Sequence, residues 1–72
     1  MSKQLAKIVS TKGIYLVEYH EKAKYNPYRV YLKWYDGYWH KNQIEAYADM
    51  ASCLFEIGRL LTGHEFMYRP EQ

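Results

Sequence analysis

The sequence has few of the features that stabilise a small domain covalently, anchor it in a membrane or direct its export. Its 72 residues include a single cysteine, Cys53, so no disulfide can form within the chain. That cysteine usage is typical of a reducing compartment. No apolar run approaches the roughly 20 residues that span a bilayer, and lysines at positions 3 and 7 interrupt any signal-peptide core at the start. We therefore expect a cytoplasmic protein that does not enter membranes.

Motifs for phosphate, dinucleotide or metal binding are also missing. The four glycines are scattered, which excludes a phosphate loop and a dinucleotide fingerprint. Among His20, His40, His64 and Cys53, the closest two are eleven residues apart, whereas zinc ligands in small domains are typically about two to four apart. His20 and His40 could meet only if the second and fourth strands were neighbours. We expect no metal and no cofactor.

No side chain stands in a context that predicts catalysis. Cys53 is flanked at helical spacing by Met50 and Ile57, where a thiol behaves as a small buried hydrophobe. Ser10 and Ser52 lack a motif, and no pair of carboxylates has a spacing that indicates acid–base work. We expect no catalytic residues and no enzymatic activity.

The hydrophobic patterning predicts one α+β domain over residues 1–72. A hydrophobic fraction of 49% argues against disorder, although the length is near the lower limit for a self-sufficient core. The expected fold is a small antiparallel sheet of three to four strands with one C-terminal helix packed on it. We predict strands over about residues 4–10, 14–21, 28–36 and 38–46, a helix over about 50–62 and a tail over 64–72.

Turn residues indicate where consecutive strands are joined, and the apolar pattern indicates which strand is central. Gly13 can take the positive φ that a turn after the first strand requires. Both faces of residues 14–21 are partly apolar, which favours a place inside the sheet. Asp36-Gly37 lies between two aromatic strands and predicts a hairpin with a two-residue type I′ turn.

The start of the helix has two interpretations. Helical spacing of apolar residues would let it begin near Gln43, while Asp49 can cap a later start by accepting bonds from the first backbone N–H groups. We favour a strand to about residue 46 and a helix from Met50, ended by Gly63. That helix carries a broad apolar stripe and a second stripe of Ala51, Phe55 and Gly58. Because a sheet covers only one side, we predict a homodimer whose interface contains Phe55, Gly58, Phe66 and Met67; the alternative cover is the tail.

The segment 28–41 concentrates the aromatic and cationic side chains. In an extended strand, Tyr28, Val30, Leu32 and Trp34 share one face, which we assign to the core. The opposite face would be a row of rings and cations, extended beyond the turn, and these are the expected partner-binding residues: Arg29, Tyr31, Lys33, Tyr35, Trp39 and Lys41.

Charge is uneven along the chain, and this row lies in its basic part. Residues 22–41 hold five lysines and arginines against one aspartate, whereas residues 42–72 hold two arginines against five carboxylates. Nine tyrosines in so short a chain favour recognition, since rigid amphipathic rings give contact area at little entropic cost. The leading hypothesis is a non-catalytic protein that binds a protein partner. Single-stranded nucleic acid is the alternative, and a purely structural or oligomer interface is the third.

Two resemblances bear on these hypotheses. Tyr31-Leu32-Lys33-Trp34, followed by a hairpin and a helix, resembles the central strand of the chromo domain over about a dozen residues. The segment Trp39-His40-Lys41-Asn42 departs from that family, so no binding residues carry over; the resemblance implies only a chromo-like module with a methyl-lysine cage as a minor alternative. In size, tyrosine content and lack of catalytic motif the chain is also similar to short proteins of phages and mobile elements, including anti-CRISPR inhibitors. That similarity implies steric blockade of a host complex.

Overall fold

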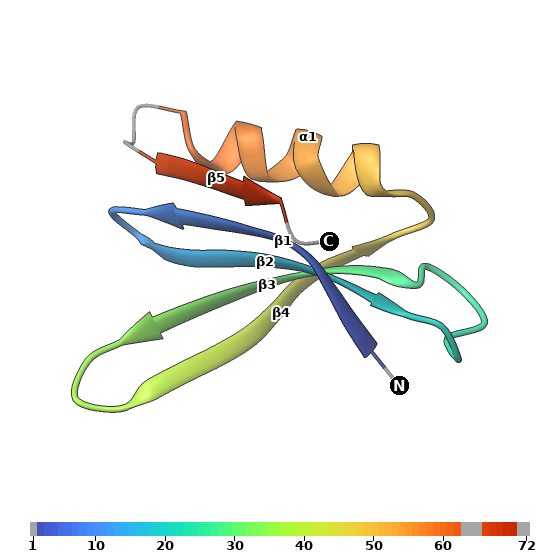
Figure 1. The fold of residues 1–72 in the computed structure, drawn as a ribbon, viewed down its shortest axis with the longest axis horizontal. Helices are drawn as coiled ribbons and strands as arrows, with labels where there is room; N and C mark the ends of the chain where they lie inside the picture. Colours follow the sequence, from blue (N-terminus) through green and yellow to red (C-terminus); the bar gives the residue numbers. More distant parts are fainter. Residues whose placement is uncertain (1, 63–65, 71–72) are drawn as a thin grey trace.

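The computed structural model describes residues 2–62 and the backbone of residues 66–70, and it contains a five-stranded sheet and one helix (Figure 1). All strand pairs are antiparallel, in the order β4-β3-β2-β1-β5. The elements are β1 (Ser2–Ser10), β2 (Gly13–His20), β3 (Tyr28–Tyr35), β4 (Trp39–Tyr47), α1 (Met50–Leu60) and β5 (Phe66–Pro70). The fold is thus a small α+β fold with a helix packed on an antiparallel sheet.

Strand β2 lies inside the sheet, between β1 and β3, as its two-sided apolar sequence predicts. Four consecutive residues from Tyr15 to Glu18 are buried, so both faces of this strand are covered. Val17 pairs with Ala6 of β1 and Val30 of β3, and all three side chains are fully buried. This triple row is the middle of the core.

The β3–β4 hairpin forms at Asp36-Gly37, but its turn is not the predicted type I′ turn. Gly37 has a positive φ of 108°, whereas Asp36 does not have one. The last strand pair is Tyr35 with Trp39, and the Asp36 N–H donates to the Tyr38 carbonyl at 3.1 Å. The loop therefore has three residues, and β4 begins one residue later than expected. Glycine at the single position of positive φ satisfies this longer loop.

The structure decides where β4 ends and the helix begins. β4 runs to Tyr47, so residue 44 belongs to a strand and not to a helix. Its pairing with β3 has a register shift between Val30 and Tyr31. Asp49 is the N-cap of α1: its backbone is extended, as is typical of N-caps, and its Oδ1 accepts a bond of 2.7 Å from the Ser52 N–H. The helix ends at Leu60, two residues earlier than the predicted residue 62.

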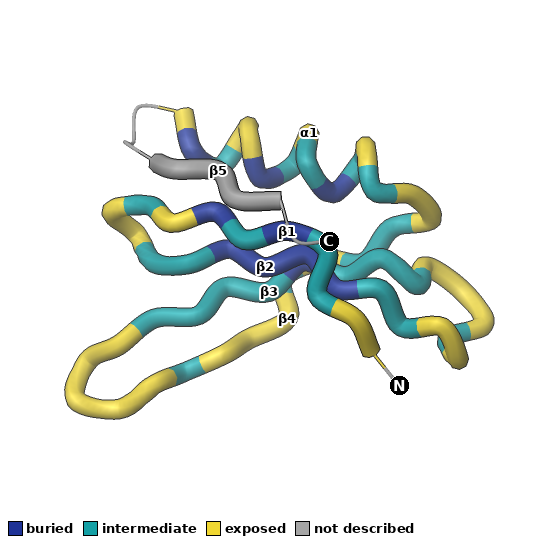
Figure 2. Tube along the Cα trace, viewed as in Figure 1, coloured by how far each residue is buried: buried dark blue, intermediate teal, exposed yellow. Residues whose placement is uncertain are grey.

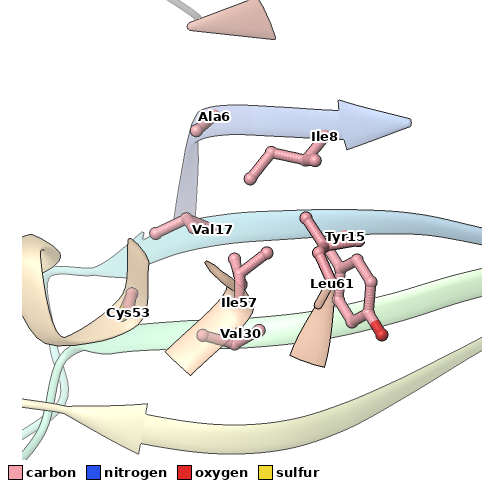
Figure 3. Close-up of a cluster of buried hydrophobic side chains, with 8 residues drawn as sticks. All are labelled: Ala6, Ile8, Tyr15, Val17, Val30, Cys53, Ile57 and Leu61. Carbon is pink, nitrogen blue, oxygen red and sulfur yellow. The ribbon is translucent and has the colours of Figure 1, made fainter. Parts of the chain in front are cut away.

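The two stripes of α1 have different surroundings (Figures 2 and 3). Cys53 and Ile57 of the first stripe, with Leu61 just past the helix end, are buried against the sheet. Around them pack the partly buried Met50, Leu54 and Leu60. Ala51, Phe55 and Gly58 are exposed. The core combines both layers: Ala6, Ile8, Tyr15, Val17, Val30, Cys53, Ile57 and Leu61.

A fifth strand follows the helix, where the sequence indicated only a tail. β5 pairs antiparallel with β1, with Ser10 opposite Phe66 and Ala6 opposite Pro70. Its backbone extends the sheet at the β1 edge. The side chains of Phe66 and Met67, which we predicted for an oligomer interface, lie outside what the structure describes.

Candidate functional site

The predicted row of rings and cations lies on one face of the sheet, opposite the helix. Val30 is in the core beneath α1, and side chains alternate along β3, so its odd-numbered neighbours Arg29 and Tyr31 point to the other side. We call this side the open face. Cross-strand pairs extend it to β4, because Trp39 lies opposite Tyr35 and Lys41 opposite Lys33. The register therefore brings all six predicted residues together.

The inner part of the row is engaged in contacts around a buried carboxylate. Glu18 of β2 is only 7% exposed, on the open face. Lys41 Nζ donates to Glu18 Oε2 at 2.6 Å, and His20 Nε2 lies 3.3 Å from Glu18 Oε1. The lysine reaches across β3 to do so, with its ammonium 4.7 Å from the centre of the Tyr31 ring. An acid without partners at this burial would be costly, and the Lys41 ammonium compensates its charge.

Tyr31 connects this acid to two further side chains. Its hydroxyl is 3.1 Å from His20 Nε2 and donates a long bond of 3.5 Å to Gln43 Oε1. We refer to Glu18, His20, Tyr31, Lys41 and Gln43 as the Glu18 network. Tyr31 and Lys41 were expected to contact a partner, but their polar atoms are already bonded within the protein.

Arg29 adjoins the network without joining it. It lies opposite Glu18 in the β2–β3 register, yet both Glu18 oxygens are bonded to other residues. Its Nε is buried and has no hydrogen-bond partner in the described part of the chain.

The outer part of the row is much more exposed. We call residues 33–40 the hairpin end; they extend away from the helix, and most of their trace is exposed (Figures 1 and 2). Tyr35 is 63% exposed, Tyr38 77% and Trp39 58%. Tyr35 and Trp39 meet edge to face with ring centres 5.3 Å apart, and Lys33 Nζ lies 4.9 Å above the Trp39 ring. Tyr35 and Trp39 thus contact each other and remain accessible, while the Tyr38 ring is edge-on to His40 with ring centres 6.5 Å apart.

Trp34, which we predicted for the core, is half-buried on the other side of the same hairpin. Its ring stacks on His40 at 4.9 Å with an angle of 15°, and His40 Nε2 is 2.7 Å from Asp36 Oδ1. Alternation puts Trp34 on the helix side correctly, but this end of the hairpin projects past the helix (Figure 1). The indole therefore packs on a histidine and not on the apolar cluster. Both sides of the hairpin end carry aromatic rings.

The described residues provide little for metal or covalent chemistry. His20 and His40 lie on opposite sides of the sheet, because His20 contacts Tyr31 on the open face whereas His40 stacks on Trp34 on the helix side. Within residues 2–62, no group of three or more histidine, cysteine, aspartate or glutamate side chains could hold a metal ion. Burial is the main cause that raises the pKa of the Cys53 thiol to about 11, so it is almost entirely protonated at neutral pH. A thiol in that state is a poor nucleophile.

The sequence interpretation missed Glu18, His20 and Gln43. Their roles depend on the register between strands distant along the chain, with Glu18 and Lys41 23 residues apart. The one available signal was an acidic residue within the otherwise apolar run of β2. The sequence interpretation also missed a cleft of about 410 Å³ near the start of β1. The cleft is lined by Ser2, Lys3, Leu5, Tyr19, Glu21 and Tyr28.

The chain's only described helix, α1, is too short to cross a membrane. Comparison of the chain with protein-family models, curated proteins and solved structures found no match. The geometry of the open face and the hairpin end is therefore the basis for a functional proposal.

Proposed function

We propose that this protein is a non-catalytic interaction protein that binds a macromolecular partner, a protein, through the hairpin end and the adjoining open face. The observation that carries the proposal is the exposure of Tyr35, Tyr38 and Trp39, each more than half exposed on a hairpin whose rings contact one another. Tyrosine and tryptophan are the residues most enriched at the energetic centres of protein interfaces. Rings already held in position lose little freedom on binding.

The division of the row gives its two parts different roles. The Glu18 network links β2, β3 and β4 through side-chain contacts on the open face, so Tyr31 and Lys41 serve mainly as support. Lys33, Tyr35 and Trp39 provide the direct contacts. A surface of this kind acts by occupying a partner's surface, which is the mode of a phage or mobile-element inhibitor of a host system.

The test is affinity capture with paired tyrosine and tryptophan variants. Tyr35→Ala with Trp39→Ala should abolish capture of the partner from host lysate, while circular dichroism and the unfolding midpoint stay close to those of the wild type. Tyr25→Ala is the matched control, because Tyr25 is 82% exposed in the β2–β3 loop, away from the hairpin end. Equal capture by the double variant, or equal loss in the control, would contradict the proposal.

Binding of single-stranded nucleic acid is the second candidate function. It is favoured by two ring–cation pairs on the open face, Lys33 over Trp39 and Lys41 over Tyr31, since bases stack on rings while cations contact phosphates. Phosphate contacts release counterions, so affinity for an oligonucleotide should fall steeply with salt. A gel shift with random oligonucleotides at two salt concentrations separates the candidates. No shift at low salt would eliminate the nucleic-acid function.

We also propose that the chain forms a homodimer through the outer side of α1. Phe55 is 76% exposed there, and Gly58 one turn further on is exposed as well. A broad hollow of about 590 Å³ lies beside the Phe55 side chain. It is lined by Tyr47, Ala51, Ser52, Phe55 and Glu56. A second copy presents the same phenylalanine and the same hollow, as a two-fold interface requires.

A further inference from the structure

A small notch lies between the β1–β2 turn and the hairpin end. Its volume is about 210 Å³, enough for an oxyanion and part of a flat group, and none of its described lining residues is a carboxylate. Two lysines, two hydroxyl residues and three aromatic rings contribute to the lining. The full set is Ser10, Thr11, Lys12, Gly13, Ile14, Lys33, Trp34, Tyr35 and Trp39.

The lysines of the notch differ from Lys41 in their partners. Lys41 is neutralised by Glu18, whereas neither Lys12 nor Lys33 forms an ion pair with another residue that the structure describes. Asp36, also in the hairpin, is bonded to His40. Contact with the Trp39 ring holds the Lys33 ammonium at the notch. Among the residues that the structure describes, the notch therefore has net positive charge and no anion.

The walls of the notch are fixed by close packing of the turn against β3. Gly13 has a φ of 142°, and a Cβ built there would lie 2.8 Å from the Lys33 carbonyl oxygen. Ser10 Oγ donates to the Gly13 carbonyl at 2.8 Å and accepts from the Lys12 N–H at 3.2 Å. The turn and β3 are thus closely packed, and a ligand would find Lys33 and the rings already assembled.

We propose that the notch binds a carboxylate, and that its occupant is an aspartate or glutamate of the partner protein, with a flat apolar side chain of the same partner against the rings. The inference rests on the proposed function. Charge complementarity supports it, because an aspartate or glutamate carboxylate would be the missing counterion of Lys12 and Lys33. A nucleic-acid strand following the row would instead pass over buried Glu18, whose Lys41 is already engaged. The positive charge available is local, which suits a single carboxylate.

The test uses two small probes of the same shape, benzoate and its neutral counterpart benzamide. Each is titrated at constant ionic strength into the full chain labelled with nitrogen-15. Benzoate should give saturable shifts of the Trp34 and Trp39 indole N–H signals and of the amides of residues 10–14, while benzamide should not. Lys33→Gln should weaken benzoate about two- to five-fold, the range of an exposed ion pair. Lys24→Gln, an exposed lysine in the β2–β3 loop, should leave it unchanged.

Other outcomes would overturn the inference. If benzoate shifts the signals of lysines elsewhere in the chain, no notch site exists. The same conclusion follows if neither Lys33→Gln nor Lys12→Gln changes the affinity for benzoate. Binding of a single-stranded oligonucleotide at the notch with steep salt dependence would replace the acidic protein residue by a phosphate. If benzoate does not bind but Tyr35 and Trp39 are still required for capture, the notch is not a binding site and the proposed function stands. If benzoate binds but capture does not depend on those rings, the proposed function is wrong.

Discussion

At the scale of single residues, neighbouring positions of one row have different energetic roles. Tyr31 and Tyr35 point to the same side of β3, yet Tyr31 is half-buried and bonded within the Glu18 network while Tyr35 is 63% exposed. The difference arises from what lies next to each ring. Tyr31 adjoins a buried acid and its lysine, whereas Tyr35 is at the projecting end of the hairpin.

Removing the lysine of the Glu18 network should cost stability. Lys41→Met leaves Glu18, a residue only 7% exposed, with His20 Nε2 at 3.3 Å as the remaining polar neighbour of its carboxylate. We expect a loss of about 1–2 kcal/mol, below the range for a fully buried pair because the lysine side chain is 44% exposed. Urea unfolding measures it, with Lys24→Met as the control.

A second substitution distinguishes loss of charge compensation from loss of packing. Glu18→Gln in the Lys41→Met background removes the uncompensated charge and should restore part of the stability. If the double variant is as unstable as the sum of the single variants, the ion pair has no coupling energy and the lysine acts only by covering the Tyr31 ring.

At the scale of elements, the β1–β2 turn and the helix offer two glycines with opposite expectations. Gly13→Ala puts a Cβ 2.8 Å from the Lys33 carbonyl at a φ of 142°, so it should destabilise by at least about 1 kcal/mol. Gly58→Ala meets no described atom of its own chain within 4 Å, so in the monomeric Phe55→Glu background it should stabilise by about 0.5–1 kcal/mol. Chemical unfolding measures both. A destabilised Gly58→Ala variant would show that something covers this glycine.

The N-cap of α1 should make helix stability depend on pH. The bond from the Ser52 N–H lowers the pKa of Asp49 in the folded protein below its ordinary value of 3.8. A group with a lowered folded pKa stabilises above the unfolded pKa, and this stabilisation is lost as pH falls through the folded value. Asp49→Ala should therefore lower the melting temperature by a few degrees at pH 7, and the difference from wild type should shrink below pH 3.8. A difference that persists at pH 2 would mean that the carboxylate charge has no part in the cap.

The sequence predicts elements whose signals are local and misses those that depend on distant pairing. Alternation from Tyr28 to Tyr35 and the Asp36-Gly37 turn suffice for the β3–β4 hairpin, and Asp49 suffices for the start of the helix. β5 is a short segment whose strand character comes from pairing with β1, more than fifty residues earlier in the chain. No local pattern encodes that contact. The Glu18 network was missed for the same reason, whereas the exposed rings of the row followed from alternation alone.

At the scale of the whole molecule, the sheet separates two surfaces with different proposed tasks. The open face and hairpin end carry rings and cations, and the outer side of α1 on the opposite side carries Phe55 beside Glu56 and Arg59, which form an ion pair with each other. A 72-residue domain without a disulfide has a small core, and association that covers an exposed phenylalanine adds to its stability. One side can therefore serve self-association while the other remains free for a partner.

This arrangement predicts a dimer that a change on the helix disrupts and a change on the open face does not. Light scattering after size exclusion at micromolar concentration should give about twice the 8.7 kDa of one chain. Phe55→Glu adds a charge at the two-fold contact, where two copies would repel, so it should give monomers. Tyr35→Glu makes the same kind of change on the hairpin end and should leave the dimer intact. A wild-type protein that elutes as a clean monomer would refute self-association, and a monomeric Tyr35→Glu with a dimeric Phe55→Glu would move the interface to the open face, where it would compete with the proposed partner.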